Sequence, residues 1–413
     1  LDLEECTDLM EDSINGIHKL WHLKYLSLGA TIGNLPRKIE KLHCLETLDM
    51  RKAKIDTLPL EVVKLPHLAH LLGKFKLGIG RNDLKMSELY KFLPKESNLQ
   101  TLAGFVADGS PGFPMLMVHM RKLKKVKIWY NATGEDIKSL ADLSTAINKF
   151  VQDEIDTSVG VRSLSLDLGN SSGNILRSLE NLYGYLSSLK LHGALSGLTQ
   201  FATSLCGLTE LCLSSTNNLM STELTNLHKL IHLEHLKLVK VSLESFIIRR
   251  KDFPRLLSLC LVQSPTLPTI EGGALPKLVS LQLLCEDLIG LSGIEIEWHK
   301  HLQEVALDSM VNMETITIWE NAAKRHPKRP RVLFLRRRGA DMLKYVATER
   351  PSAAETGSST ERRKRERHEV QSSLVIDLDS HLKRLKFSDP PLASTELPNA
   401  RNEAMPSSSR AVS

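Results

Sequence analysis

The chain has 413 residues, 42% hydrophobic and 25% charged, proportions typical of a soluble globular protein with a large core. No apolar run approaches the roughly 18 residues that a membrane-spanning helix needs, and no secretory leader is visible, so we expect no membrane span. None of the six cysteines forms a Cys-x-x-Cys pair, and six is few for a disulfide scaffold of this length. A reducing, cytoplasmic environment is therefore expected.

The net charge of +6 is unevenly distributed along the chain. Residues 324–413 contain 20 Lys and Arg against 11 Asp and Glu, whereas residues 1–323 contain 34 against 37. The basic excess therefore belongs to the last part of the chain, and we expect no nucleic-acid partner for the body.

A pattern Leu-x-x-Leu-x-Leu recurs along the chain. Clear copies begin at Leu23, Leu45, Leu123, Val161, Leu186, Leu208, Leu233, Leu256, Leu278 and Leu302, and weaker copies begin at Leu68 and Leu99. Most intervals average about 23 residues, within the range of leucine-rich repeats. Alternation places the leucines of each short strand on one face, and stacked neighbours bury that face. We predict an α/β leucine-rich-repeat solenoid, a horseshoe of about 13 repeats with a parallel concave β-sheet.

Two intervals are longer than the others, those that begin at Leu68 and at Leu123. We interpret them as loops or short helices at one edge of the solenoid. A degenerate repeat around residues 137–155 is an equal alternative for the second interval.

The two ends of the chain differ from its middle. At the start, Leu1 and Cys6 fit the second leucine and the Asn/Cys position of a repeat, so we expect an N-terminally truncated domain over residues 1–335. After Leu335 the pattern stops, and residues 350–413 are rich in Ser, Pro, Glu and Arg. Residues 336–413 are therefore predicted to form a basic, mostly disordered tail.

Two consecutive repeats carry a Leu-Pro step, Leu35-Pro36 and Leu58-Pro59, followed by an apolar residue and a closing Lys-Leu. These repeats, together with residues 98–109 and 322–332, resemble the repeat domain of plant intracellular nucleotide-binding leucine-rich-repeat (NLR) disease-resistance proteins. The resemblance covers roughly residues 1–335. It implies a protein-interaction domain that acts in plant defence and innate immunity, by recognising pathogen effectors or by autoinhibiting its own receptor.

The family's nucleotide-binding module has no counterpart here, because no G-x-x-x-x-G-K-[ST] motif is present. An intracellular leucine-rich-repeat signalling scaffold without such a module is therefore the alternative function. A ubiquitin-ligase adaptor is a third class, but it would need an F-box-like helical segment that is not visible. Residues preceding Leu1 in the gene would separate these three functions.

Neither catalysis nor a cofactor is expected. No Ser/His/Asp or paired-carboxylate arrangement stands out, so we predict no catalytic residues and a protein that is not an enzyme. His228, His232 and His235 have spacings that suggest a metal, but the repeat explains them, because His232 directly precedes a repeat's first leucine as other histidines do. No metal site is predicted.

Function on a solenoid normally sits on the concave strand face, where the non-leucine residues of neighbouring repeats align. The protein-binding candidates on this face are Tyr25, Asp49, Arg51, Lys74, Phe105, Lys125, Lys127, Trp129, Lys190, His192, His235 and Lys237. Their expected partners are a pathogen effector, a host guardee, or the nucleotide-binding module of the same receptor.

Two groups of these candidates are basic. The first combines Lys125 and Lys127 with Trp129 on one strand, an aromatic among charges that is typical of an interface anchor. The second lies two repeats further on and consists of Lys190, His192, His235 and Lys237. The alternative is that all these residues are merely the solvated face of a sheet.

The tail contains two short motifs. Arg362, Arg363, Lys364 and Arg365 form a candidate nuclear-import signal, which would add the nucleus to the cytoplasm as a location. Leu374, Val375, Ile376 and Leu378, flanked by acidic residues, resemble a SUMO-interacting motif, which binds by adding a strand to its partner's sheet. The alternatives are a solvated basic run for the first, and a stray apolar patch or a helix start for the second.

Overall fold

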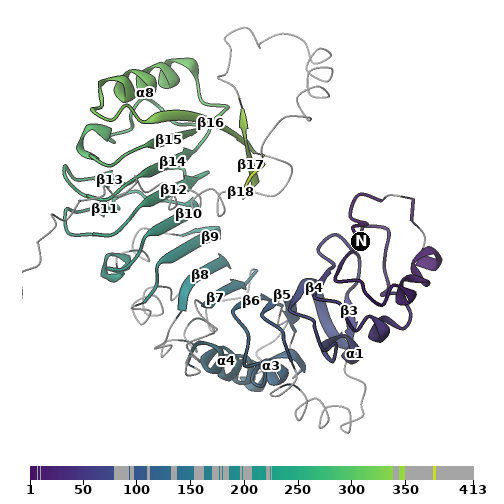
Figure 1. The fold of residues 1–413 in the computed structure, drawn as a ribbon. Helices are drawn as coiled ribbons and strands as arrows, with labels where there is room; N and C mark the ends of the chain where they lie inside the picture. Colours follow the sequence, from purple (N-terminus) through teal and green to yellow (C-terminus); the bar gives the residue numbers. More distant parts are fainter. Residues whose placement is uncertain are drawn as a thin grey trace, which may run out of the picture.

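The computed structural model describes residues 1–78 except 7 and 10, 97–108, 112–131, 137–152, 162–169, 186–195, 207–219, 226–337, 344–348 and 375–377, and the single residues 93, 176, 179, 198 and 224. Over these residues the chain forms one curved array, with a long sheet on its inner side and helices on its outer side (Figure 1).

Successive strands of the sheet lie side by side in chain order. The parallel strands are β1 (Tyr25–Ser27), β2 (Thr47–Asp49), β4 (His70–Gly78), β5 (Thr101–Ala107), β6 (Lys125–Tyr130), β7 (Arg162–Asp167), β8 (Leu186–Gly193), β9 (Glu210–Leu219), β10 (His235–Val241), β12 (Ser258–Val262), β14 (Ser280–Leu284), β15 (Glu304–Asp308) and β16 (Arg331–Arg337). The predicted solenoid with a parallel concave sheet is confirmed, while the number of about 13 repeats stays a prediction.

The repeat leucines form ladders through the core. Leu26, Leu48 and Leu71 are partners on β1, β2 and β4, and the same ladder reaches Leu281 and Val305 on β14 and β15. All five side chains are fully buried. Since burying one such side chain contributes roughly 1.5–3 kcal/mol, each strand gains its stability from the neighbours that cover it.

The described return segments on the outer side contain mostly short elements. They comprise the 3-10 helices η1 (Glu11–Ile14), η2 (Ile17–Lys19), η3 (Ile39–Lys41), η4 (Leu227–Lys229) and η5 (Ile296–Trp298), the helices α1 (Leu60–Val63), α3 (Gly112–Met117), α4 (Ile137–Gln152) and α8 (Met313–Arg325), and the strands β3 (Thr57–Pro59), β11 (Ile247–Ile248) and β13 (Thr269–Ile270). β3 pairs with β4, and β11 pairs with β13 in a separate two-stranded sheet.

The long interval after Leu123 contains α4, so it holds a helix as predicted, although with 16 residues this helix is not short. β6 pairs directly with β7 on either side of this helix, so no extra repeat strand is inserted between them. The buried face of α4 follows the helical period, because its inward residues are Leu143, Ala146, Ile147, Phe150 and Val151.

Glycine bulges interrupt two neighbouring strands. The register shifts between Leu72 and Phe75 in β4 and between Ala103 and Phe105 in β5, where Gly104 has a φ of +118°. Phe75 and Phe105 are partners, and both are fully buried. The prediction that Phe105 lies on the concave face is therefore wrong, because the extra residue in the bulge turns its side chain into the core.

The sheet continues beyond the boundary expected at residue 335. β17 (Lys344–Thr348) pairs antiparallel with β16, and β18 (Val375–Asp377) pairs antiparallel with β17. In Figure 1 both strands turn toward the inner side of the array. None of the helices in the described part of the chain is long and apolar enough to cross a membrane.

Candidate protein-binding face

Side chains between the repeat leucines form columns across the concave face. The first column contains Tyr25, Thr47, His70, Thr101, Lys125, Ser163, Ser188, Glu210, His235, Ser258, Ser280, Glu304 and Arg331. The second contains Ser27, Asp49, Leu72, Ala103, Lys127, Ser165, Lys190, Cys212, Lys237, Cys260, Gln282, Ala306 and Leu333. Both columns are basic over β6, and toward β16 the first stays polar while the second becomes largely apolar.

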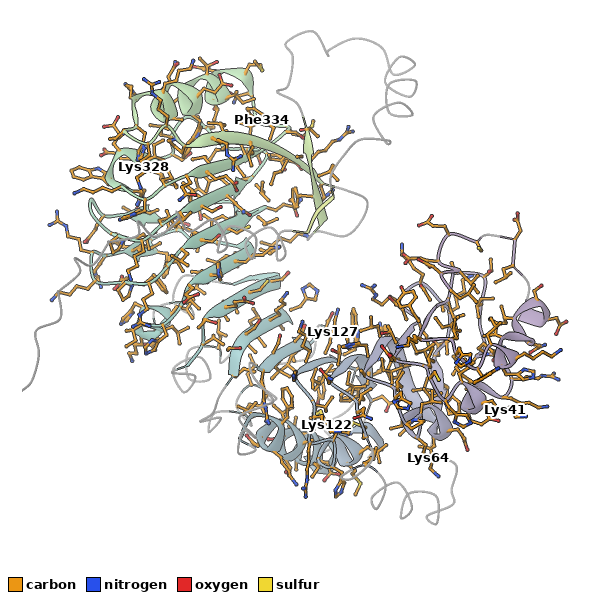
Figure 2. All side chains as sticks on the ribbon, viewed as in Figure 1. Lys41, Lys64, Lys122, Lys127, Lys328 and Phe334 are labelled. Carbon is orange, nitrogen blue, oxygen red and sulfur yellow. The ribbon has the colours of Figure 1, made fainter. Side chains whose placement is uncertain are left out.

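A cluster of cations surrounds one indole on this face. The Nζ atoms of Lys127 and Lys74 lie 4.2 Å and 4.4 Å from the centre of the Trp129 ring, within the range of cation–π attraction. Lys127 lies on the inner side of the array (Figure 2). Lys125 is exposed two residues earlier on β6. We call Lys74, Lys125, Lys127 and Trp129 the Trp129 cluster.

The backbone explains why Lys74 joins this cluster. Lys74 lies in the bulge of β4, between the positions at which the β4–β5 register shifts, and its side chain reaches over β5 to Trp129 on β6. Next to it, the Nζ of Lys76 forms a 2.8 Å ion pair with the Asp108 carboxylate, which raises the pKa of Lys76. Because the nearby Asp108 is paired with Lys76, the three lysines of the Trp129 cluster keep a net positive charge beside the half-buried indole ring.

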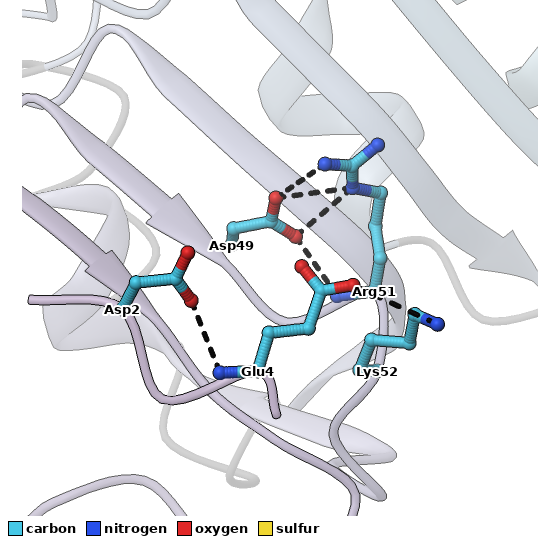
Figure 3. Close-up of polar contacts among 5 residues, drawn as sticks. All are labelled: Asp2, Glu4, Asp49, Arg51 and Lys52. Carbon is cyan, nitrogen blue, oxygen red and sulfur yellow. Dashed lines mark hydrogen bonds and ion pairs between the residues drawn. The ribbon is translucent and has the colours of Figure 1, made fainter. Parts of the chain in front are cut away.

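The candidates on the first strands form a different arrangement (Figure 3). The Arg51 side chain donates from Nε to Asp49 Oδ1 at 3.0 Å and from Nη2 to Asp49 Oδ2 at 2.6 Å. Asp49 is only 3% exposed, and its hydrogen bonds raise the pKa of Arg51. Nearby, Lys52 pairs with Glu4 at 3.6 Å. The buried Asp49 carboxylate thus holds the Arg51 side chain in place. Tyr25, on the neighbouring strand, is 40% exposed.

The second predicted basic group is only partly accessible. His192 is exposed and lies 2.9 Å from Ser214 Oγ through its Nδ1, and Lys190 is half-buried. His235 and Lys237, in contrast, are only 8% and 6% exposed. Two of the four residues therefore offer a partner little surface.

The described structure also contains an apolar group on the concave face that the sequence analysis did not select. Val239, Val262 and Leu284 directly follow the third leucine of their repeats on β10, β12 and β14 and form a third column of the concave face. They pack with Tyr345 of β17. All three are fully buried. The signal was present in the sequence, because a third-column position on an open concave face is normally polar.

Asp308 lies at the end of β15, beside this apolar group. Burial raises the pKa of its carboxyl above the ordinary value, against the opposing effect of the hydrogen bond that the Met310 amide donates to Oδ1 at 2.9 Å. The charged form of Asp308 is therefore partly desolvated in the folded state.

A family model described as a leucine-rich repeat region matches residues 1–332. The chain belongs to this leucine-rich-repeat family. The leucine-rich-repeat fold and family predicted from the Leu-x-x-Leu-x-Leu pattern are thus confirmed.

Several plant proteins are similar to this leucine-rich-repeat chain. Disease resistance protein RGA4 of Oryza sativa subsp. japonica is 52% identical over 339 residues, which are 81% of this chain and 33% of RGA4. Disease resistance protein Pik-2 of the same rice is 28% identical over 387 residues, which cover 80% of this chain and 37% of Pik-2. The chain therefore spans about a third of the length of the curated relatives it matches.

Solved structures of similar fold include a leucine-rich-repeat protein of Leptospira interrogans and an internalin of Listeria monocytogenes. The first has a TM-score of 0.39 and 19% identity, and covers 77% of this chain and 80% of its own. The second has a TM-score of 0.35 and 15% identity, and covers 79% of this chain and 83% of its own.

The two tail motifs lie at or beyond the edge of the described leucine-rich-repeat structure. The candidate import signal, residues 362–365, lies outside the described residues, as do Leu374 and Leu378 of the candidate SUMO-interacting motif. The other two residues of that motif, Val375 and Ile376, belong to β18, whose backbone pairs with β17. Both motifs stay predictions.

We expect Asp308→Asn to stabilise the leucine-rich-repeat domain at pH 7. An unfolded aspartate titrates near pH ~4, and because the folded pKa is higher, the native state keeps its proton over a range in which the unfolded chain has lost it. Stability that is present below the unfolded pKa is then lost as pH rises through the folded pKa. The Asn side chain does not ionise, so the variant does not lose this stability as the pH rises. Its Tm should therefore exceed that of the wild type at pH 7, with a difference that shrinks toward pH ~4. Equal Tm values at pH 7 would contradict the burial cost assigned to Asp308.

Proposed function

We propose that this chain is the protein-recognition region of a plant disease-resistance protein and that the Trp129 cluster is its main contact site. The partner is a pathogen effector, a host protein that the receptor guards, or the nucleotide-binding module of the same receptor. Similarity to disease resistance proteins RGA4 and Pik-2 supports the role in defence. The low number of cysteines and the lack of a Cys-x-x-Cys pair in the sequence support a cytoplasmic location.

The observation that carries this proposal is the pairing of Lys74 and Lys127 with the half-buried ring of Trp129 on the concave face. An aromatic ring held by its neighbours loses little conformational freedom on binding and offers a large contact area. The surrounding lysines favour a partner surface that is acidic and that presents an apolar side chain to the ring. Tyr25 offers a second exposed aromatic toward the start of the array.

The charge-reversal variant Lys125→Glu/Lys127→Glu tests this proposal. In full-length chain expressed in plant leaves, we expect co-precipitation of the partner to fall by about tenfold or more, because each reversal replaces attraction by repulsion of an acidic surface. Quantitative mass spectrometry of the captured proteins, together with the immune cell-death response, measures this loss.

The matched control is Lys41→Glu/Lys328→Glu, which makes the same change of charge at two exposed lysines away from the inner side of the array (Figure 2). It should leave both the captured proteins and the immune response at wild-type levels. Unchanged capture and unchanged response in the Lys125/Lys127 variant would exclude the Trp129 cluster as the contact site.

A further inference from the structure

The concave face near the C-terminal end of the sheet is apolar, unlike the face around the Trp129 cluster. Its third column contains Val239, Val262 and Leu284 on β10, β12 and β14, and its second column contains Cys260 and Ala306. On an open inner face these side chains would contact water. Each of them is at most 1% exposed, so something covers this half of the face.

The cover includes a strand of the chain itself. Tyr345 of β17 is 1% exposed and belongs to the same apolar cluster as Val239, Cys260, Val262 and Leu284. β17 reaches this position because it pairs antiparallel with β16, with Tyr345 opposite Arg337, and does not continue the parallel array. Figure 1 shows β17 and β18 turned toward the inner side, beside the strands that carry the cluster.

This covered face is not built like the leucine core. Gln282 is fully buried beside the cluster, and its Oε1 has no hydrogen-bond partner among the described residues. Burial of an unsatisfied amide oxygen opposes folding by about 1–3 kcal/mol. Asp308 is also buried there at 5% exposure. The unsatisfied Gln282 Oε1 and the desolvated Asp308 carboxyl therefore offset part of the stability that the apolar contacts of Tyr345 contribute.

We infer that β17 is a built-in occupant of the C-terminal half of the concave face, anchored by Tyr345, and that it moves away while the repeat core stays folded. The surface it uncovers is an apolar strip that accepts an extended segment with an aromatic side chain, as β17 itself supplies. This inference goes beyond the proposed function and stands whether or not the Trp129 cluster binds a partner.

Cys260 provides a direct measure of this motion. Its thiol lies within the covered cluster and is 1% exposed, so N-ethylmaleimide reaches it only when the cover opens. Cys285 belongs to the leucine core, and burial raises its thiol pKa to about 11, so it should react only on global unfolding. Mass spectrometry of the alkylated full-length chain measures both rates separately.

In the wild-type chain, we expect Cys260 to react at a rate that depends weakly on urea at low concentration, and Cys285 to follow global unfolding. In Tyr345→Ala, the Cys260 rate should rise by at least about tenfold while the Cys285 rate stays within about twofold of wild type. Tyr345→Phe keeps the ring in the cluster, and Ala347→Ser changes an exposed residue of β17, so both should behave as wild type.

Two results would overturn the inference. The first is an unchanged Cys260 rate in Tyr345→Ala, which would mean that Tyr345 does not protect this face. The second is a parallel rise of the Cys260 and Cys285 rates, or an identical urea dependence of both in the wild type, since β17 would then be part of the cooperative core. Neither result depends on capture of a partner, so this test can fail while the Trp129 cluster still binds one.

Discussion

Replacing Gly104 by alanine is expected to destabilise the solenoid by roughly 3–5 kcal/mol, a large effect for the addition of one methyl group. Gly104 adopts a φ of +118°, and a Cβ built on it would overlap the backbone carbonyl of Gly73 on the neighbouring strand. The clash is with backbone, so no side-chain rotation relieves it. Relief requires separating β4 from β5, which would also displace Phe75 and Phe105 from the core.

Gly169→Ala is the matched control for this prediction. Gly169 also has a positive φ, +54°, but a Cβ there would have open space around it. Its cost should be limited to the left-handed backbone conformation, about 1 kcal/mol. Urea denaturation followed by circular dichroism compares the two. Equal destabilisation by both substitutions would show that the stacked bulges of β4 and β5 add no constraint of their own.

Trp319→Ala is the second substitution with a large expected effect, about 3–5 kcal/mol. Trp319 lies on α8, is fully buried, and donates from Nε1 to the Gly290 carbonyl at 2.8 Å. The Gly290 amide in turn donates to Thr315 Oγ1 at 3.0 Å. Both the N–H and the C=O of Gly290, in the loop after β14, are therefore hydrogen-bonded to side chains of α8. Loss of the indole leaves a cavity at the C-terminal end of the core.

A solenoid is stabilised by contacts between neighbours, so this damage should stay local. Hydrogen exchange with mass spectrometry should show faster exchange in β14, β15 and β16 and unchanged exchange in β1 and β2. Trp319→Phe keeps an aromatic ring but is smaller and lacks the N–H donor, so a smaller loss of about 1–2 kcal/mol is expected. Uniformly faster exchange along the whole sheet would contradict the local assignment.

Residues 25–129 show how far the sequence determines the candidate site. The alternation in β6 puts Lys125, Lys127 and Trp129 on one face, as predicted, because the period of a regular strand is a local property. The same rule placed Phe105 on that face, and it failed because the bulge at Gly104 adds one residue to β5. Contact of Lys74 with Trp129 depends on a second bulge, at Gly73, and on β5 lying between the two strands.

In the C-terminal half of the concave face, too, the sequence predicts which face a residue lies on but not whether that residue is accessible. The sequence places His235 and Lys237 in concave columns, and the strand registers agree. Their low exposure, and that of Val239 on the same strand, is not a property of the strand. For Val239 it arises from packing with Tyr345 of β17, and a contact between residues about a hundred positions apart leaves no periodic signal.

The repeat leucines by themselves determined the fold class, the order of the strands and the side of each regular strand that faces the core. This was sufficient because each leucine must be covered by its counterpart in the next repeat, so one short pattern specifies the whole array. The tertiary structure alone decided which concave residues remain accessible. That depends on backbone bulges at glycines and on a C-terminal strand that returns to the inner face, and both involve contacts that no local pattern encodes.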